Sequence, residues 1–221
     1  IGDRVVSNGG HAEIVQVSKN LCVKIPDDVN SEEASFTVLG SVALQAIRLA
    51  KPELGESFLV IGLGIIGLLS IQILNANGCK VIALDFNEDR LKLAKNLGAI
   101  CINLAVIEDP ISDILNLTQE IGVDGAIIAT ATDSNDPMQQ AAQACRQKGR
   151  IVLVGTTGLA FSRAEFYLKE LSFQVACAYG LGRYDPLYEE QGIDYPIGIA
   201  RWTIQRNFMT ILELMKNKRL D

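Results

Sequence analysis

The sequence contains 221 residues, 48% of them hydrophobic, and carries a formal net charge of −6 at pH 7. This is enough apolar material for one large α/β domain, or for one domain and part of another. Because the charge is negative and spread along the chain, we expect no nucleic-acid partner, and no apolar run is long enough to suggest a membrane span. Five scattered cysteines without a Cys-x-x-Cys pair indicate reduced thiols and hence a cytoplasmic protein.

The first thirty residues predict a small β-structure. Short apolar runs at residues 4–6, 12–17 and 22–24 are separated by Asn-Gly-Gly and Ser-Lys-Asn, which are good turn sequences. This stretch is too short for a domain, so we expect the end of a β-domain, or a β-layer packed on the next unit. Since the pattern starts at Ile1 rather than at a Met, we expect the chain to be a fragment of a longer protein.

A helix is predicted over residues 31–50. Ser31 can cap it, two glutamates suit its first turn, and apolar residues then recur at helical spacing. Gly40 either weakens this helix or marks a place of close packing.

The most informative stretch is a Gly-x-Gly-x-x-Gly turn. An apolar run at residues 58–61 leads into Gly62, Gly64 and Gly67, and a helical pattern follows over residues 68–76. This strand–turn–helix context is what allows the short motif to be interpreted as a dinucleotide site. Gly62 permits the tight turn, a side chain at Gly64 would collide with a pyrophosphate, and Gly67 lets the helix pack closely on the strand. The alternative is an ordinary tight connection between a strand and a helix.

A second signal lies at the end of the next predicted strand. Asp85 follows the predicted strand at residues 80–84 and stands 18 residues after the last glycine of the turn. A carboxylate there accepts hydrogen bonds from both ribose hydroxyls and repels a 2′-phosphate, which favours NAD over NADP. The backbone amides of Ile65 and Ile66, at the start of the helix, would face the phosphates. Arg90 is the complication, because a basic residue near this pocket can tolerate a phosphate.

Strands and helices alternate from residue 58 onward, which predicts an α/β fold with a doubly wound parallel sheet of the Rossmann type. Residues 180–199 are predicted to form a long irregular loop, which precedes the last helix. The predicted strands after the first are residues 80–84, 100–103, 125–130, 150–154 and 171–178, and the predicted helices are residues 89–97, 111–121, 137–145 and 201–217.

Small residues follow two of these strands. Thr130 and Ala131 come after the fourth strand, and Gly155 and Thr156 come after the fifth. An open parallel sheet binds its ligands at the carboxyl ends of its strands, so these four residues can let the nicotinamide end lie against backbone. Small residues at strand ends are equally typical of ordinary turns.

Several strings resemble a known superfamily. Gly-Asp-Arg-Val-Val at residues 2–6, Gly-His-Ala-Glu at residues 10–13 and the glycine turn are similar to the medium-chain dehydrogenases/reductases of alcohol dehydrogenase type. A narrower resemblance is to the bi-domain oxidoreductases, in which a medium-chain dehydrogenase half is followed by a Gfo/Idh/MocA-type half. The strings that carry it lie at residues 20–22, 36–40, 163–167, 182–186 and 194–198.

The resemblance covers the whole chain and implies its organisation. Residues 1–30 would be the tail of a GroES-like β-domain, residues 31–200 the NAD-binding Rossmann domain, and residues 201–221 a C-terminal helix that returns toward the catalytic domain. It further implies NAD(H) at the glycine turn, with Asp85 on the adenosine ribose and Arg90 near it. The implied partners are an alcohol or carbonyl substrate related to sugars, a fused or associated catalytic domain, and a second copy that pairs through the sheet edge.

The departures from the family pattern concern zinc. Ser41 stands where zinc-dependent members carry a Cys, and serine is a poor zinc ligand. The four-cysteine lobe of members with structural zinc has no counterpart here, so we predict a zinc-independent dehydrogenase with no metal site and with catalytic residues that these residues do not identify. Two alternatives stay open: a zinc-dependent alcohol or polyol dehydrogenase with ligands upstream, and a non-catalytic nucleotide-binding module. In each case we expect the fragment alone to bind NAD(H) and to turn over little.

A few polar residues carry weaker functional hypotheses. The single histidine, His11, is expected to be structural, because a lone His lacks catalytic partners. Lys169 and Glu170 either line a cleft or form a solvated face. The residues that either approach a substrate or shape the long loop are Arg183, Tyr184, Asp185 and Tyr195, while Trp202 is expected to anchor the final helix.

Overall fold

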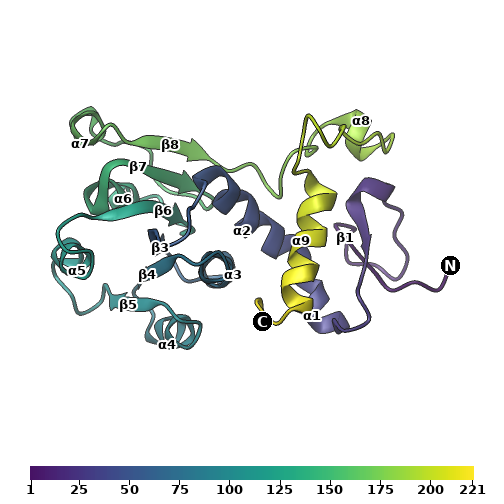
Figure 1. Cartoon of the computed structure of the whole chain (residues 1–221), viewed down its shortest axis with the longest axis horizontal. Coiled ribbons are helices and arrows are strands. Elements are labelled where there is room, and N and C mark those ends of the chain that lie inside the picture. The colour runs from purple at the N-terminus through teal and green to yellow at the C-terminus, as the bar shows by residue number, and fades with distance from the viewer. The chain divides into compact units, whose positions relative to one another are not determined.

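A computed structural model describes all 221 residues of the chain, which divide into two compact units. The first unit comprises residues Ile1–Gln45 together with Cys177–Asp221, and the second comprises Ala46–Ala176. The two units are described separately (Figure 1).

The second unit contains one sheet of six parallel strands, in the order β5-β4-β3-β6-β7-β8. The central strand β3 pairs with β4 on one side and with β6 on the other, so that Leu59 lies opposite both Ile82 and Ala126. This is the strand order of a Rossmann fold, and it confirms the predicted doubly wound sheet. The strands are β3 (Ser57–Ile61), β4 (Lys80–Asp85), β5 (Ile100–Asn103), β6 (Val123–Ile128), β7 (Cys145–Leu153) and β8 (Ser172–Val175).

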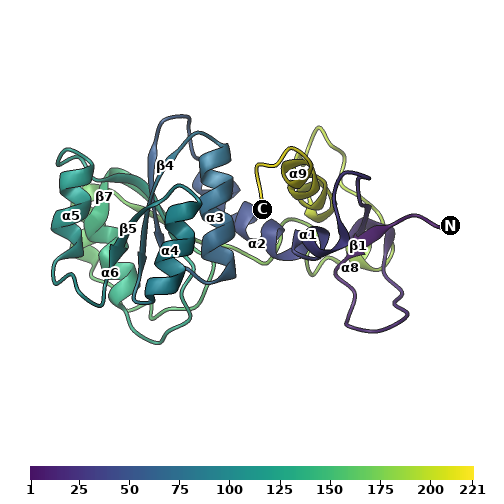
Figure 2. The same ribbon diagram turned by 90° about the horizontal axis from the view of Figure 1, so that it is seen from below.

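Helices cover both faces of this sheet. In Figure 2, α3 (Ile65–Ala76) and α4 (Glu88–Asn96) lie on one side, and α5 (Pro110–Leu117) and α6 (Asp136–Ala144) lie on the other. Side-chain caps explain where two of them begin. Asn87 accepts hydrogen bonds from two amides of α4, and Asp109 accepts one from α5.

The sheet and helices α5 and α6 enclose one hydrophobic core. Buried residues from five strands pack against Ile114 of α5 and Met138 of α6. Burying a side chain of this size stabilises the fold by about 2 kcal/mol, so this core holds the strands and the two helices together. The strand residues of this core are Leu59, Ile61, Ile82, Leu84, Val123, Ala126, Ile128, Ile151 and Leu153, with Ile102 from β5.

A network of charged side chains ties together the amino-terminal edge of the same sheet. Asp124 accepts hydrogen bonds from the Ser57 amide at 2.8 Å and from the Arg146 guanidinium at 2.6 Å. Glu56 binds the Arg150 guanidinium at 2.6 Å, and Arg150 also donates to the Lys51 carbonyl oxygen. We call this network the paired edge.

The first unit combines a two-stranded antiparallel sheet with helices from both ends of the chain. Strands β1 (Val5–Ser7) and β2 (Cys22–Lys24) pair, with the 3-10 helix η1 (Lys19–Leu21) before β2. The helices are α1 (Ser31–Ser35), α2 (Thr37–Ala50), which continues into the second unit, α8 (Pro186–Glu189) and α9 (Ile204–Lys216). A Cβ at Gly40 of α2 would lie 2.9 Å from the Ile211 side chain of α9, so this glycine marks close packing.

The structure corrects two predictions near the N-terminus. Residues 12–17 form no strand, because they find no pairing partner and leave Ile14 91% exposed. The helix predicted over residues 31–50 is interrupted at Phe36 and forms α1 and α2. At this break the Thr37 hydroxyl donates to the Ala34 carbonyl oxygen, which offers that acceptor an alternative to a helical bond.

Two short helices were not predicted. Helix α7 (Arg163–Lys169) has no buried residue, so it has no apolar periodicity to reveal it. Helix α8 lies in the region predicted to be a long irregular loop. There Asp185 caps the helix, and the Tyr188 ring is completely buried.

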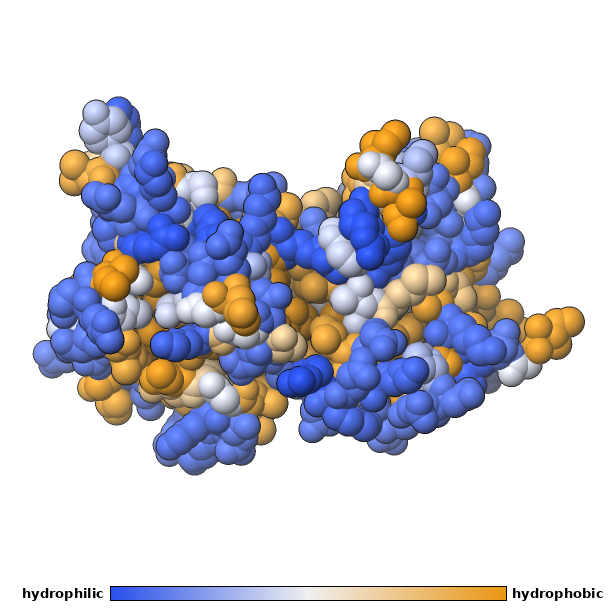
Figure 3. Space-filling model, in the orientation of Figure 1, coloured by the Kyte–Doolittle hydropathy of each residue, from blue (hydrophilic) through white to orange (hydrophobic).

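The surface is mixed in character. Hydrophobic residues on the face shown in Figure 3 form small groups between hydrophilic ones. Among the helices there is none that combines the length and the apolar character needed to cross a membrane.

Candidate functional site

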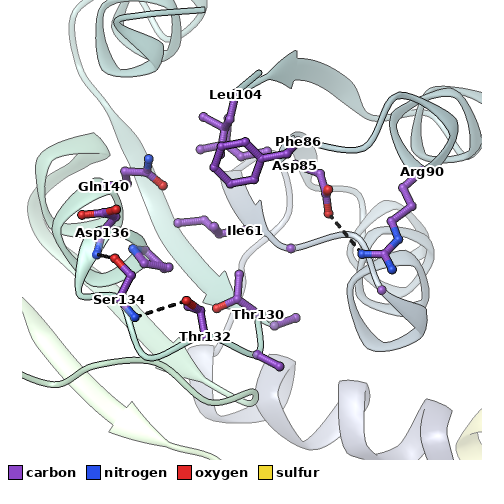
Figure 4. A pocket seen from close by; sticks show the side chains of 16 residues that line it. Ile61, Asp85, Phe86, Arg90, Leu104, Thr130, Thr132, Ser134, Asp136 and Gln140 are labelled. Atoms are coloured by element: carbon purple, nitrogen blue, oxygen red, sulfur yellow. Dashed lines mark hydrogen bonds and ion pairs between the residues drawn. The ribbon is translucent and has the colours of Figure 1, made fainter. Parts of the chain in front are cut away.

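The second unit has a cavity of about 640 Å³ at the carboxyl edge of its sheet (Figure 4). This volume suits a ligand of the size of a drug or a nucleotide. Four segments line the cavity: the end of β3 with its glycine turn, the end of β4 with the start of α4, the residue after β5, and the loop from β6 into α6. The predicted site residues that line it are Gly62, Gly64, Asp85, Arg90, Thr130 and Ala131.

The turn after β3 is tight because of Gly62. Its φ is +90°, and a Cβ on it would lie 2.9 Å from the Thr130 amide nitrogen. Both the backbone conformation and the close approach of the loop after β6 therefore require a glycine here.

The other two glycines of the motif differ in what surrounds them. A Cβ at Gly67 would lie 2.0 Å from the Gly62 carbonyl oxygen, so α3 packs against the turn only because this side chain is absent. A Cβ at Gly64 would have no protein atom within 4 Å, and the φ of Gly64 is an ordinary −67°. Nothing in the protein itself therefore requires a glycine at position 64, and the open space that its missing side chain leaves is part of the cavity wall.

Helix α3 begins beside this open space. Gly64 is its N-cap and offers no side chain to the first amides of the helix, which are those of Ile65, Ile66 and Gly67. Uncapped amides and the positive end of the helix dipole make this a favourable place for an anion. These three residues contribute backbone near the cavity, although they do not line it.

Asp85 is held in one position by the backbone around it. One carboxylate oxygen accepts from the Leu63 amide of the glycine turn at 2.7 Å, and the other accepts from the Asn87 amide at 2.8 Å. The Arg90 guanidinium lies 3.9 Å away and is 54% exposed, so it balances the charge of the carboxylate only loosely. Asp85 thus connects the end of β4 to the glycine turn and presents a fixed carboxylate at the cavity.

The residues after β6 form the opposite wall, and the residues after β7 support it. Thr156 donates its amide to the Thr130 carbonyl oxygen at 2.8 Å, and a Cβ at Gly155 would lie 2.0 Å from that same oxygen. Gly155 and Thr156 therefore hold the loop that carries Thr130 and Ala131, and they do not line the cavity themselves. The Thr130 hydroxyl is buried without a hydrogen-bond partner, which costs free energy unless a ligand or water satisfies it.

The structure adds cavity residues that the sequence analysis missed. Phe86 directly follows Asp85, and this adjacency was the available signal for it. Thr132 follows the predicted Ala131 in the same way, and Ile61, Leu84 and Ala129 directly precede predicted residues or the glycine turn. The others had no signal in the sequence, because only the fold brings the residue after β5 and the start of α6 to the cavity. They are Leu104, Ser134, Asp136, Pro137 and Gln140.

The weaker candidates have structural partners instead. The Lys169 ammonium donates to the carbonyl oxygens of Ala142, Gln143 and Cys145, at 3.0, 2.6 and 2.7 Å, and so caps the end of α6. Burial lowers the pKa of Lys169, and these carbonyl groups are its only hydrogen-bond partners. His11 is exposed.

The long loop of the first unit is shaped by its own side chains. Arg183 forms an ion pair with Glu189 at 2.6 Å, and the Tyr195 hydroxyl donates to the Asp185 carboxylate. This bond is the main cause that raises the pKa of Tyr195. Tyr184 is exposed and stacks against the Arg183 guanidinium.

A comparison with protein families identifies the chain. A model of the family described as zinc-binding dehydrogenase matches residues 66–190, which is more than half of the chain. The chain belongs to this zinc-binding dehydrogenase family.

Curated relatives in this family are dehydrogenases by name. The chain is 33% identical over 147 residues to (R,R)-butanediol dehydrogenase of Bacillus subtilis, a match that covers 66% of this chain and 42% of that protein. It is 32% identical over 150 residues to an alcohol dehydrogenase of Geobacillus stearothermophilus, covering 67% of this chain and 43% of the relative. The matched region thus spans less than half the length of these relatives.

Solved structures of other dehydrogenases have the same fold. The crystal structure of 2R,3R-butanediol dehydrogenase from Bacillus subtilis matches with a TM-score of 0.78 and 26% identity, over 98% of this chain and 63% of that one. Galactitol-1-phosphate dehydrogenase from Escherichia coli matches with a TM-score of 0.77 and 23% identity, over 96% and 57% of the two chains. The second likeness shows the fold alone.

The family name implies a zinc ion, and the residues of this chain do not fit one. No three or more His, Cys, Asp or Glu side chains are grouped so that they could hold a metal ion. Ser41 is completely buried in α2, and its hydroxyl donates to the Thr37 carbonyl oxygen at 2.9 Å. We therefore derive no chemical step through zinc from these residues.

Proposed function

We propose that this chain is the NAD(H)-binding part of a medium-chain dehydrogenase that acts on an alcohol or carbonyl substrate. The observation that carries the proposal is the open space at Gly64, a position where no contact within the protein requires a glycine. Beside this space lie the uncapped amides of α3 and the fixed carboxylate of Asp85. A dinucleotide matches this combination, because its diphosphate needs close approach to the amides and its ribose needs a hydrogen-bond acceptor.

In this proposal the residues of the chain bind and orient. The amides of Ile65 and Ile66 hold the diphosphate, Asp85 accepts from the adenosine ribose hydroxyls, and Arg90 stands beside it. Thr130 and Ala131, braced by Gly155 and Thr156, form the wall that the rest of the cofactor lies against. The nicotinamide cofactor, when bound, supplies the hydride chemistry.

Zinc independence is the second part of the proposal. The family resemblance aligns Ser41 with the cysteine of zinc-dependent members, and this serine is buried with its hydroxyl donating to the Thr37 carbonyl oxygen. Metal analysis of a preparation that contains the whole protein tests this. One equivalent of zinc that is needed for turnover would support the alternative in which the ligands lie outside these residues.

Three wider statements are part of the same proposal. The organisation predicted above, with a GroES-like tail at residues 1–30, a cofactor domain at 31–200 and a returning helix at 201–221, belongs to it. So do a catalytic domain that is fused or associated, including a Gfo/Idh/MocA-type half, and a homodimer that pairs through a sheet edge. Light scattering of the purified chain at several concentrations tests the homodimer.

A fluorescence titration tests the central proposal. The chain should bind NADH saturably and prefer it to NADPH, because the Asp85 carboxylate repels a 2′-phosphate. Asp85→Asn keeps an oxygen for one backbone amide and removes the charge. It should therefore lower the affinity for NADH and reduce the preference for NADH over NADPH about tenfold. A folded chain that shows no saturable binding of NADH would contradict the proposal. If the whole protein binds NAD(H) and turns over no alcohol or sugar, it is a non-catalytic module.

A further inference from the structure

One part of the cavity extends past Asp85 and has both a flat apolar surface and a free polar group. Phe86 and Leu104 lie on one side of it, and Ile61 lies at its floor (Figure 4). Phe86 is 68% exposed, although it belongs to the cavity lining. An exposed aromatic ring at a cavity wall offers a face on which a planar base can stack.

The free polar group is the amide of Gln140. Its side chain comes from α6 and points toward Ile61 in Figure 4. Gln140 is partly buried and lines the cavity, and its side-chain amide forms no hydrogen bond with another group of the chain. The amide nitrogen can therefore donate to a ligand in the cavity, and the amide oxygen can accept from it.

The neighbouring polar side chains of this wall are already occupied. The Thr132 hydroxyl accepts from the Ser134 amide at 3.2 Å, and the Ser134 hydroxyl accepts from the Asp136 amide at 3.0 Å. These bonds shape the loop into α6. The Asp136 side chain is exposed in the first turn of α6, where the helix dipole favours a negative charge. Gln140 is thus the side chain on this wall whose donor and acceptor are both available to a ligand.

We propose that Gln140 recognises the edge of the adenine base in the bound cofactor. A glutamine amide matches adenine because its oxygen accepts from the 6-amino group while its nitrogen donates to N7. Phe86 provides the stacking face for the same base. The inference rests on the proposed function, since it assigns the base of a dinucleotide whose ribose lies at Asp85.

This recognition discriminates between bases that differ only at position 6. Hypoxanthine carries an oxygen there, so both its O6 and its N7 are acceptors. Whichever way the amide of Gln140 is turned, its own oxygen then faces an acceptor. One hydrogen bond is lost and one repulsion is added, which corresponds to about a tenfold loss of affinity.

The test compares NADH with reduced nicotinamide hypoxanthine dinucleotide in the same fluorescence titration of the 221-residue chain. The unmodified chain should bind NADH about ten times more tightly. Gln140→Leu should bring the ratio of the two affinities close to one. Gln139→Leu is the matched control, because Gln139 is exposed, does not line the cavity, and should leave the ratio at its original value.

Phe86→Ala separates stacking from recognition. It should weaken both dinucleotides several-fold and leave their ratio unchanged, because every base has a face that stacks. Unchanged binding in this variant would show that the base does not lie on Phe86.

The remaining outcomes decide between the two proposals. If the chain binds NADH and Gln140→Leu keeps the tenfold ratio, or weakens both dinucleotides equally, the role of Gln140 is overturned and the proposed function stands. If the folded chain binds neither dinucleotide, both are overturned.

Discussion

Two aspartates at opposite edges of one sheet have similar local bonding and different surroundings. Asp85, at the carboxyl edge, accepts from the Leu63 amide, and Asp124, at the amino edge, accepts from the Ser57 amide. The charge of Asp124 is balanced by the Arg146 guanidinium at 2.6 Å, whereas Arg90 stands 3.9 Å from Asp85. The charge of Asp124 is therefore balanced within the protein, whereas the carboxylate of Asp85, which lines the cavity, has no close cationic partner.

This difference extends to the groups around each aspartate. At the paired edge, Glu56, Arg146 and Arg150 bind one another or backbone carbonyl groups. At the cavity, the Thr130 hydroxyl is buried without a hydrogen-bond partner, the Gln140 side chain faces the open space, and no protein atom occupies the place of a Gly64 side chain. Polar groups that line a cavity without a protein partner are the ones that a ligand can satisfy.

The largest expected effect is on stability, and it comes from a substitution in the glycine turn at the cavity edge of the sheet. Gly67→Ala places a Cβ 2.0 Å from the Gly62 carbonyl oxygen, so the helix must move away from the turn. We expect a loss of about 3 kcal/mol in the free energy of unfolding, measured in urea. Gly64→Ala is the control, since its Cβ meets no protein atom. Gly64→Ala should keep the stability of the parent chain and lower its affinity for NADH at least tenfold. Equal stability of the two variants would contradict the assigned geometry.

The next effect compares the two aspartates directly. Asp124→Asn should lower the free energy of unfolding by about 2 kcal/mol, because Arg146 loses its nearer charged partner at a site where both side chains are two-thirds buried or more, and keeps only Glu56 at 3.8 Å. Asp85→Asn should cost about 1 kcal/mol, since one backbone amide loses its acceptor. In NADH titrations the order reverses, and only the Asp85 variant binds more weakly. A common order in both measurements would argue against separate roles for the two edges.

A smaller effect concerns the unpaired hydroxyl of Thr130. Thr130→Val should leave the free energy of unfolding within about 0.5 kcal/mol, because it removes a buried group that has no partner. Thr132→Val removes an acceptor of the Ser134 amide and should cost about 1 kcal/mol. If a bound cofactor forms a hydrogen bond with the Thr130 hydroxyl, only Thr130→Val should lower the affinity for NADH, by about fivefold. A destabilised Thr130→Val would mean that the hydroxyl already has a partner.

The smallest effect uses Cys145, at the start of β7 near the paired edge. Burial raises the pKa of this thiol to about 12, so almost none of it is thiolate at pH 8. Thiol reagents at pH 8 should label the exposed Cys177 quickly and Cys145 only when the chain unfolds. Because the proposed NADH site lies at the other edge, saturating NADH should change the labelling of Cys145 only through global stability. Rapid labelling of Cys145 in the native chain would show that the paired edge opens locally.

The sequence predicted the parts of this site that depend on backbone geometry. The glycine turn and Asp85 belong to one strand–helix–strand unit, in which they follow β3 and end β4. Because these strands are parallel neighbours, the spacing in the sequence alone predicts that the two lie together. The cavity role of Gln140 had no such signal, because it depends on how α6 is rotated against the sheet. The strand predicted over residues 12–17 failed for a related reason, since a strand needs a neighbour to pair with.

Side chains that work locally were also hard to predict. Lys169 looked like part of a solvated face, and the structure uses it to cap three carbonyl groups at the end of α6. The partner of such a side chain is a helix end 24 to 27 residues away, and residue type gives no indication of it.

The pairing of β6 with β7 continues beyond the strands themselves. Ala131 forms a further parallel bridge with Thr156, and Thr132 donates its amide to the Thr156 carbonyl oxygen at 3.0 Å. The wall that carries Thr130 is therefore hydrogen-bonded to the sheet and is not a hinged flap. Any adjustment during ligand entry falls to the opposite rim, where Phe86 and Arg90 are exposed, so the speed of capture depends on side-chain rotations of nanoseconds rather than on a slow loop closure.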